Sequence, residues 1–339
     1  MSRAALTTTR SRRQRPRALP QAQRGIALLV AILLVAIGTI IAAAVAYENA
    51  MTARRGTATY AFDQALLISE GAEALAAYGL KQLVQSDPQH TYPGQGWDKP
   101  VGPFEVVPGV MLEASLEDLQ GRFNLNNLVD GQGAADPTYV AAFNKLLELV
   151  GLEPKWTGLI VDWIDADIVP SNPDGAEDSV YMGQTPPYRT ANRFITSASE
   201  LLALPGFGRD RYLKIAPFVT ALPQGTQMNV CTAKGEVLDA FLQGSQTEWS
   251  GTNADQLAKT RQNTTGCFPD PTVFMKNLGT QQGTKTAAGG GGGKFGQNSK
   301  YFRLTSFITI GGAEFDLYSL MYVDGTGAVR PLQRSFTPD

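Results

Sequence analysis

The longest apolar stretch in the chain runs from Ile26 to Ala46 and contains no charged residue and no proline. Because an α-helix rises about 1.5 Å per residue, about 20 such residues span about 30 Å, the thickness of one bilayer core. Helix-forming residues continue without a break to Val84, with a period of about 3.6 residues. This period predicts one buried face, made of Phe62, Ala65, Leu66, Ser69, Ala72, Ala76, Leu80 and Leu83. The pattern predicts one helix of roughly 59 residues, which first crosses a membrane and then packs against a soluble domain.

Beyond this helix, strand-like and helix-like patterns form separate blocks. Alternating residues predict strands at Phe104–Val107 and Val110–Leu119, and three more within Lys300–Phe336, where Gly311-Gly312 and Asp324-Gly325 supply hairpin turns. Between these blocks, helical periods predict five helices, at Tyr139–Val150, Trp156–Ile168, Ser199–Leu204, Asp210–Phe218 and Lys234–Leu242. The chain therefore predicts an α+β fold, in which a long helix lies on an antiparallel sheet and a large helical insertion domain divides that sheet.

These patterns divide the chain into five parts. They are a basic leader (1–25), the membrane-spanning part of the helix (26–46), the rest of the helix with the first strands (47–117), the helical insertion (118–222), and the remaining sheet with a glycine-rich linker (223–339).

Charge is distributed unevenly along the chain. The first 25 residues hold seven arginines and no acid, which leaves 22 basic against 31 acidic residues in the remainder, a net charge of −9. Arginines before the apolar stretch, and none after it until Arg54, predict a cytoplasmic N-terminus and a body across the membrane. An acidic body argues against nucleic acid as a partner. Two alternatives stay open: a cleaved signal peptide ending within Ala42–Ala46, or a plain membrane anchor.

An acidic cluster is the strongest chemical signal in the sequence. Within about 17 residues it holds six carboxylates: Asp162, Asp165, Asp167, Asp174, Glu177 and Asp178. Such a cluster repels itself unless a cation relieves it, and oxygen ligands in an irregular loop suit Ca²⁺ better than Mg²⁺. The EF-hand pattern fails, because Val169 and Pro170 occupy two of its positions. A solvated acidic loop and a pair of hydrolytic carboxylates are the alternatives.

Other motifs carry less chemistry. Pro205-Gly206-Phe207-Gly208 resembles a helix-hairpin-helix turn, but the chain has no wider basic surface for DNA. The glycine run at 289–293 lacks the residues of a phosphate-binding loop. The single histidine, His90, has no nucleophilic partner set around it, so catalysis is not expected. Cys231 and Cys267 are the only cysteines, and an oxidising compartment beyond the membrane favours a disulfide between them.

A basic leader, a glycine and an apolar helix with an amphipathic continuation resemble the N-terminus of type IV pilin-like proteins. The resemblance implies the pilin-like fold, cleavage by prepilin peptidase between Gly25 and Ile26, and methylation of Ile26. Most pilins carry glutamate at the fifth mature position, where its charge in lipid needs the N-terminal amine of a neighbouring subunit. Here that residue is Val30, as expected of a subunit that caps a filament.

Four segments resemble the K family of type II secretion pseudopilins in order and spacing: DLQGRFNLNNL, the DWIDAD region, SASELLALPGF and NVCTAKGEVLDAF. The family's calcium binding implies ligands at Asp165, Asp167, Asp174, Glu177 and Asp178, whereas Asp162 is expected to be structural. The chain departs from the family at Cys231, where an asparagine is usual.

This resemblance implies a non-enzymatic minor pseudopilin in the inner membrane, with a single membrane span and a periplasmic body. It would cap the tip of the pseudopilus with the I and J pseudopilins, next to H and the major pseudopilin, and help to start assembly and protein export. Two alternatives are a tip minor pilin of a type IV pilus or competence system, and a signal-anchored periplasmic calcium-binding enzyme.

Overall fold

The computed structural model describes residues 21–242 and 293–337, together with positions 249, 256, 259–261, 267 and 274. The leader up to residue 20 and the glycine run at 289–292 lie outside the described residues. The chain separates into two compact units, which meet in sequence between Phe62 and Asp63.

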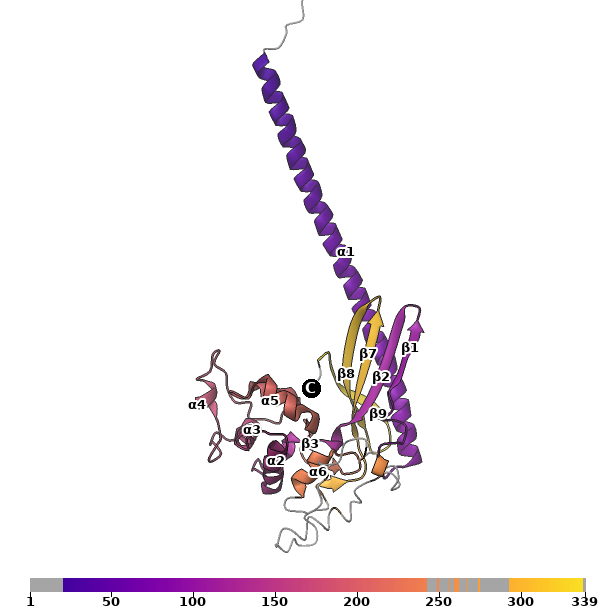
Figure 1. Ribbon diagram of the computed structural model, residues 1–339, viewed down its shortest axis with the longest axis vertical. Helices are drawn as coiled ribbons and strands as arrows, with labels where there is room; N and C mark the ends of the chain where they lie inside the picture. Colours follow the sequence, from indigo (N-terminus) through magenta and orange to yellow (C-terminus); the bar gives the residue numbers. More distant parts are fainter. Residues whose placement is uncertain are drawn as a thin grey trace, which may run out of the picture. The chain divides into compact units, whose positions relative to one another are not determined.

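Helix α1 is a single helix of 66 residues, Gln21–Ser86 (Figure 1). It includes the whole predicted helix, and Gln21 is its first described residue. From Ile26 onward it is long and apolar enough to cross a membrane, and its most apolar window buries nothing inside the protein. The first unit is therefore a candidate membrane anchor.

Five antiparallel strands form the sheet of the second unit, in the order β1-β2-β7-β8-β9 (Figure 1). Their bounds are β1 Val101–Val107, β2 Val110–Asp118, β7 Tyr301–Ile310, β8 Ala313–Val323 and β9 Val329–Ser335. The predicted strands are confirmed. Along β7 and β8, alternate residues point to opposite faces of the sheet, and the residues on one face are buried, as the alternating sequence pattern predicts.

The part of α1 that follows Asp63 covers one face of this sheet. Its buried residues Ala65, Ala72, Leu80 and Leu83 form a core with alternate strand residues. The strand residues of this core are Val110, Leu112, Phe302, Leu304, Ile308, Met321 and Val323. Phe62 was also predicted on this face but is 38 % exposed.

Helices and short strands fill the described chain between β2 and β7. In order they are the 3-10 helix η1 Leu119–Gly121, β3 Phe123–Asn124, η2 Leu125–Leu128, α2 Pro137–Leu149, α3 Trp156–Ile164, α4 Asp178–Tyr181, η3 Ala198–Ala203, α5 Gly208–Ile215, η4 Ala216–Phe218, β4 Val219–Thr220, β5 Met228–Asn229, α6 Gly235–Phe241 and β6 Phe295–Gly296. They enclose a second core, in which Phe123, Phe143, Ile160 and Phe207 are almost fully buried.

The structure corrects one predicted boundary. Helix α3 ends at Ile164 instead of Ile168, because Asp165 takes an extended conformation. Val237 and Leu238 of α6 are fully buried in the same core as the preceding helices. The predicted helix at Ser199–Leu204 is the 3-10 helix η3.

Asp118, the last residue of β2, joins the sheet to the helical core. Its Oδ2 accepts hydrogen bonds from Ser299 Oγ at 2.6 Å, from Asn229 Nδ2 at 3.2 Å and from Thr232 Oγ1. Its Oδ1 accepts one from the backbone N–H of Gln120 at 2.8 Å. All four donors are neutral. Burial raises the pKa of Asp118 to about 6, against the lowering effect of these hydrogen bonds.

Candidate metal centre

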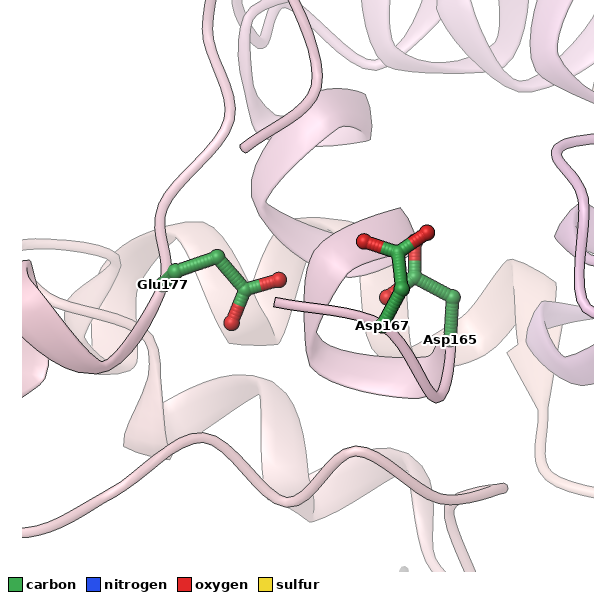
Figure 2. A group of neighbouring side chains, drawn as sticks. All are labelled: Asp165, Asp167 and Glu177. Carbon is green, nitrogen blue, oxygen red and sulfur yellow. The ribbon is translucent and has the colours of Figure 1, made fainter. Parts of the chain in front are cut away.

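Three of the predicted acidic residues come together where α3 ends. Asp165, Asp167 and Glu177 each offer a carboxylate oxygen, and these oxygens all lie within 4.8 Å of one another. Figure 2 shows that Asp165 and Asp167 extend from the turn after the helix, whereas Glu177 reaches toward them from a separate segment of chain. The early end of α3 makes this convergence possible, because a continuous helix to Ile168 would keep the carboxylates on its own surface.

Two oxygens of this group are buried and have no hydrogen-bond partner. They are Oδ1 of Asp165 and Oε1 of Glu177, and the two residues are only 7 % and 4 % exposed. A buried polar atom without a partner carries a free-energy cost. An ion in contact with these oxygens would remove that cost.

The electrostatics of the site also favour a cation. Burial, followed by the charges of Asp167, Asp162 and Glu177, raises the pKa of Asp165 to about 7. Burial also raises the pKa of Glu177, with further contributions from neighbouring carboxylates and against a hydrogen bond from Thr190. The group is therefore a set of crowded carboxylates that a positive charge would stabilise.

Asp162 supports the loop from within, as the sequence suggested. It is fully buried, and its two carboxylate oxygens lie 3.1 and 3.0 Å from the backbone N–H of Ser171, which donates to them. A side chain at Gly175 would bring its Cβ within 2.3 Å of Asp162 Oδ2 and 2.2 Å of the Ser171 nitrogen, so only glycine fits there. These contacts fold the acidic loop back over the end of α3.

The other two predicted ligands, Asp174 and Asp178, do not join the group of three. Oδ1 of Asp178 accepts hydrogen bonds from Thr190, from its backbone N–H at 3.1 Å and from its hydroxyl at 3.0 Å. Oδ2 of Asp178 lies 3.6 Å from Arg189 Nη1. Asp174 is exposed.

Sequence reasoning missed Asn192, which lies beside the group. It has a φ of 45°, in the left-handed region that few residues other than glycine adopt. Its Nδ2 donates to the backbone oxygen of Asp167 at 3.0 Å, while its Oδ1 is buried without a partner. No periodic pattern marks this residue. The three carboxylates form an all-oxygen set of the kind that a hard divalent ion such as Ca²⁺ prefers, and an amide oxygen would extend it.

The remaining predicted site residues lie elsewhere. Cys231 and Cys267 form a disulfide, with their Cα atoms 4.4 Å apart. Cys231 is fully buried in the helical core. Gly25 and Ile26 lie within the continuous helix α1, where Ile26 is 64 % exposed.

Comparison with known proteins gives consistent matches. Residues 121–224 match the family model described as type II secretion system (T2SS), protein K. The chain is 32 % identical to type II secretion system protein K of Pseudomonas aeruginosa over 92 % of each chain. It is also 32 % identical to the protein of that name from Klebsiella pneumoniae, over 89 % of this chain and 93 % of the relative.

A solved structure has the same fold. It is the crystal structure of the GspK-GspI-GspJ complex from the enterotoxigenic Escherichia coli type 2 secretion system, and the matching chain superposes with a TM-score of 0.70. The match covers 84 % of this chain and 100 % of that one, at 24 % sequence identity.

Proposed function

The chain belongs to the family of type II secretion system protein K, and we propose that it caps the tip of the pseudopilus as a minor pseudopilin. At the tip it helps to initiate assembly of the pseudopilus, and thereby the export of folded periplasmic proteins across the outer membrane.

The identity of residue 30 is the observation that most supports a capping role. Once prepilin peptidase has removed residues 1–25 and methylated Ile26, Val30 is the fifth residue of the mature chain. A glutamate there needs a cationic partner in the lipid, which the N-terminal amine of the subunit ahead supplies. Val30 is uncharged and 48 % exposed on α1, so it creates no such requirement. A subunit that needs nothing ahead of it suits the end of a filament.

The charge distribution supports a single pass through the inner membrane. Seven arginines precede the apolar stretch, which places the leader in the cytoplasm with prepilin peptidase. The body from Asp63 onward then lies in the periplasm.

The partners follow from the tip position. The solved relative assembles with GspI and GspJ, and we propose the corresponding I and J pseudopilins as neighbours of this chain, with H and the major pseudopilin below them. An apolar groove of about 600 Å³ lies between α1 and the strands β1 and β2, lined by Leu75, Tyr78, Val101, Phe104 and others. This groove offers a surface for the helix of a neighbouring subunit.

We propose a structural role for Ca²⁺ in this protein. Asp165, Asp167 and Glu177 would hold the ion, with Asn192 as a neutral oxygen donor. The buried, unpartnered oxygens of Asp165, Glu177 and Asn192 support this arrangement. The ion supplies positive charge and fixes the loop between α3 and α4.

We propose no catalytic role. His90 lies in a turn after α1, where its Nδ1 is 2.9 Å from Oδ1 of Asp87. This pair is partly exposed and stabilises the turn that follows the helix.

The proposal is tested by locating the subunit in the pseudopilus. Pseudopili are purified from cells that express the secretion system with an epitope-tagged chain, labelled with gold against the tag, and examined by electron microscopy. Label is expected at one end of each filament, and mass spectrometry is expected to find methylated Ile26 at the mature N-terminus. Val30→Glu is expected to move label into the shaft, and the control Val30→Ala is expected to leave it at the end. Label along the shaft in the wild type would exclude the capping role.

A further inference from the structure

A small cavity lies where the sheet meets the helical core. Arg303 on β7 and Tyr318 on β8 line it from the sheet, and Thr196 lines it from the helical segment. Arg303 and Tyr318 alternate along their strands with the residues that pack against α1, so the cavity is on the other face of the sheet. Its volume of about 20 Å³ is enough for one or two water-sized groups.

Two arginines give this cavity a positive charge. Among the described residues that line it, Arg122 and Arg303 are the only charged ones. They share a single carboxylate, that of Glu117. Its Oε1 accepts a hydrogen bond from Arg122 Nε at 2.9 Å, and its Oε2 accepts one from Arg303 Nη2 at 2.6 Å. Two cations on one anion leave an excess of one positive charge, although the body as a whole is acidic.

The groups around the arginines maintain this excess. Lys234 adds a positive charge that acts on Glu117, and Glu236 is the acid that offsets it. Although burial raises the pKa of Glu117, the charges of Arg122 and Arg303 hold it below its usual value. The pKa of Lys234 is lowered, first by burial and then by the charge of Arg122. A further negative group at this place would therefore be stabilised.

One donor of the cavity is unused. Within the described part of the chain, Nε of Arg303 is buried and has no hydrogen-bond partner, which carries a free-energy cost. Other donors at the cavity are engaged. Arg122 Nη1 donates to the backbone oxygen of Ala216 at 3.0 Å. The N–H and the hydroxyl of Thr196 donate to Glu200 Oε1, at 2.7 and 3.0 Å. Arg303 is thus the residue with a free N–H for a ligand, and Arg122 supplies charge.

We propose that this cavity binds one carboxylate group, with Arg303 as its hydrogen-bond donor and Arg122 as a second positive charge. A guanidinium group matches a planar carboxylate in shape and charge. The small volume fits two oxygen atoms and excludes a bulky anion such as a nucleotide. Gln333 of β9 is exposed and also lines the cavity, so the site can be reached from solvent. The carboxylate belongs either to a free organic anion or to an acidic side chain of a docked polypeptide.

The experiment measures the thermal midpoint of the full chain in non-ionic detergent, without added calcium. Sodium acetate is compared with sodium chloride at the same pH and ionic strength. At about ten times the dissociation constant, acetate is expected to raise the midpoint by about 3 °C. Arg303→Gln is expected to lose this difference, whereas Arg330→Gln, exposed on β9, is expected to keep it. The response to acetate is compared because Arg303→Gln also removes an ion pair with Glu117.

A second variant tests the site with Arg303 in place. Gln333→Glu puts a carboxylate on the wall of the cavity, so it is expected to raise the midpoint in chloride and to abolish the response to acetate. N-acetyl-aspartate amide distinguishes the two sources. A response to this compound identifies an acidic side chain as the ligand, and a response to acetate alone identifies a free anion. Equal responses to acetate in the wild type and Arg303→Gln, or no response in the wild type, overturn the proposal.

Discussion

Arg334 on β9 donates to both carboxylate oxygens of Glu73 on α1, from Nε to Oε1 at 2.8 Å and from Nη2 to Oε2 at 2.7 Å. Glu73 is only 4 % exposed, and Ser319 Oγ donates to it as well, at 2.6 Å. Although burial raises the pKa of Glu73, the hydrogen bonds from Arg334 and Ser319 hold it below the usual value. The last strand of the sheet is thus attached to the helix by a charged pair.

Replacing Arg334 is expected to destabilise the protein, because Glu73 would stay buried without its cation. Arg334→Ala should lower the free energy of unfolding by about 2 kcal/mol, measured by urea denaturation of the full chain in detergent. The double variant Glu73→Ala, Arg334→Ala should cost less than the two single changes together. Arg330→Ala, on the same strand, should cost less, about 0.5–1 kcal/mol, because Arg330 is exposed and lies 5.8 Å from the centre of the Tyr322 ring. A similar small effect of Arg334→Ala would show that the pair contributes little.

Asp118 is expected to make stability fall as pH rises. Its pKa is about 6 in the folded protein against a usual value of 3.8, so the folded state binds the proton more tightly. As pH rises from 4 to 6, Asp118 loses its proton in the unfolded state before it does so in the folded state. The free energy of unfolding therefore falls by about 3 kcal/mol over this range. Asp118→Asn should remove this contribution.

The measurement for Asp118 is the difference in unfolding free energy between wild type and variant from pH 4 to 7. Wild type and variant are compared because carboxylates with lowered pKa values, such as Glu73 and Glu117, make the unfolding free energy rise with pH and would mask the effect of Asp118 in the wild type alone. Glu314→Gln, exposed on β8, serves as the control. Parallel curves for wild type and Asp118→Asn would exclude a titration of Asp118 in this range.

Calcium is expected to raise the thermal midpoint of the wild type relative to EDTA. At a free Ca²⁺ concentration about 100 times the dissociation constant, binding raises the free energy of unfolding by about 2.7 kcal/mol. Asp165→Asn and Glu177→Gln should lose this gain, whereas Asp174→Asn should keep it, because Asp174 lies outside the group of three. In EDTA, Asp165→Asn should be more stable than the wild type, since one of the crowded charges is gone. An equal calcium shift in Asp165→Asn and the wild type would argue against the assigned ligands.

The disulfide is expected to stabilise the helical core. It closes a loop with a sequence separation of 36 residues, for which chain entropy predicts about 3–4 kcal/mol. Reduction with dithiothreitol should lower the unfolding free energy of the wild type by about this amount. Cys267→Ala should show the lower value from the start and should not respond to dithiothreitol. An unchanged wild type under reduction would mean that the bond does not contribute.

The sheet and the long helix could be predicted from the sequence because their signals are periodic. Residues such as Phe302 and Leu304 alternate with polar neighbours along β7, and α1 combines an uncharged stretch with a face of small residues. Both patterns reflect one-sided burial, which repeats along the chain.

The grouping of the carboxylates could be predicted only in part, since it depends on how irregular segments converge. Sequence reasoning placed five ligands in one loop. Asp165, Asp167 and Glu177 come together there, whereas Asp178 accepts hydrogen bonds from Thr190 and Asp174 is exposed. Asn192 was missed because a single asparagine with a left-handed φ has no periodic signal.

The placement of β2 next to β7 has a consequence for the order of folding. Asp118 and Ser299, which meet at the end of this strand pair, are 181 positions apart in sequence. Because the chain is synthesised from its N-terminus, β2 emerges with the edge that pairs with β7 open, and all the intervening residues follow before β7 is made. The helical segment can complete local contacts in that interval, whereas closure of the sheet is a late, high-contact-order event. Until then β2 is an unpaired edge and a site for aggregation.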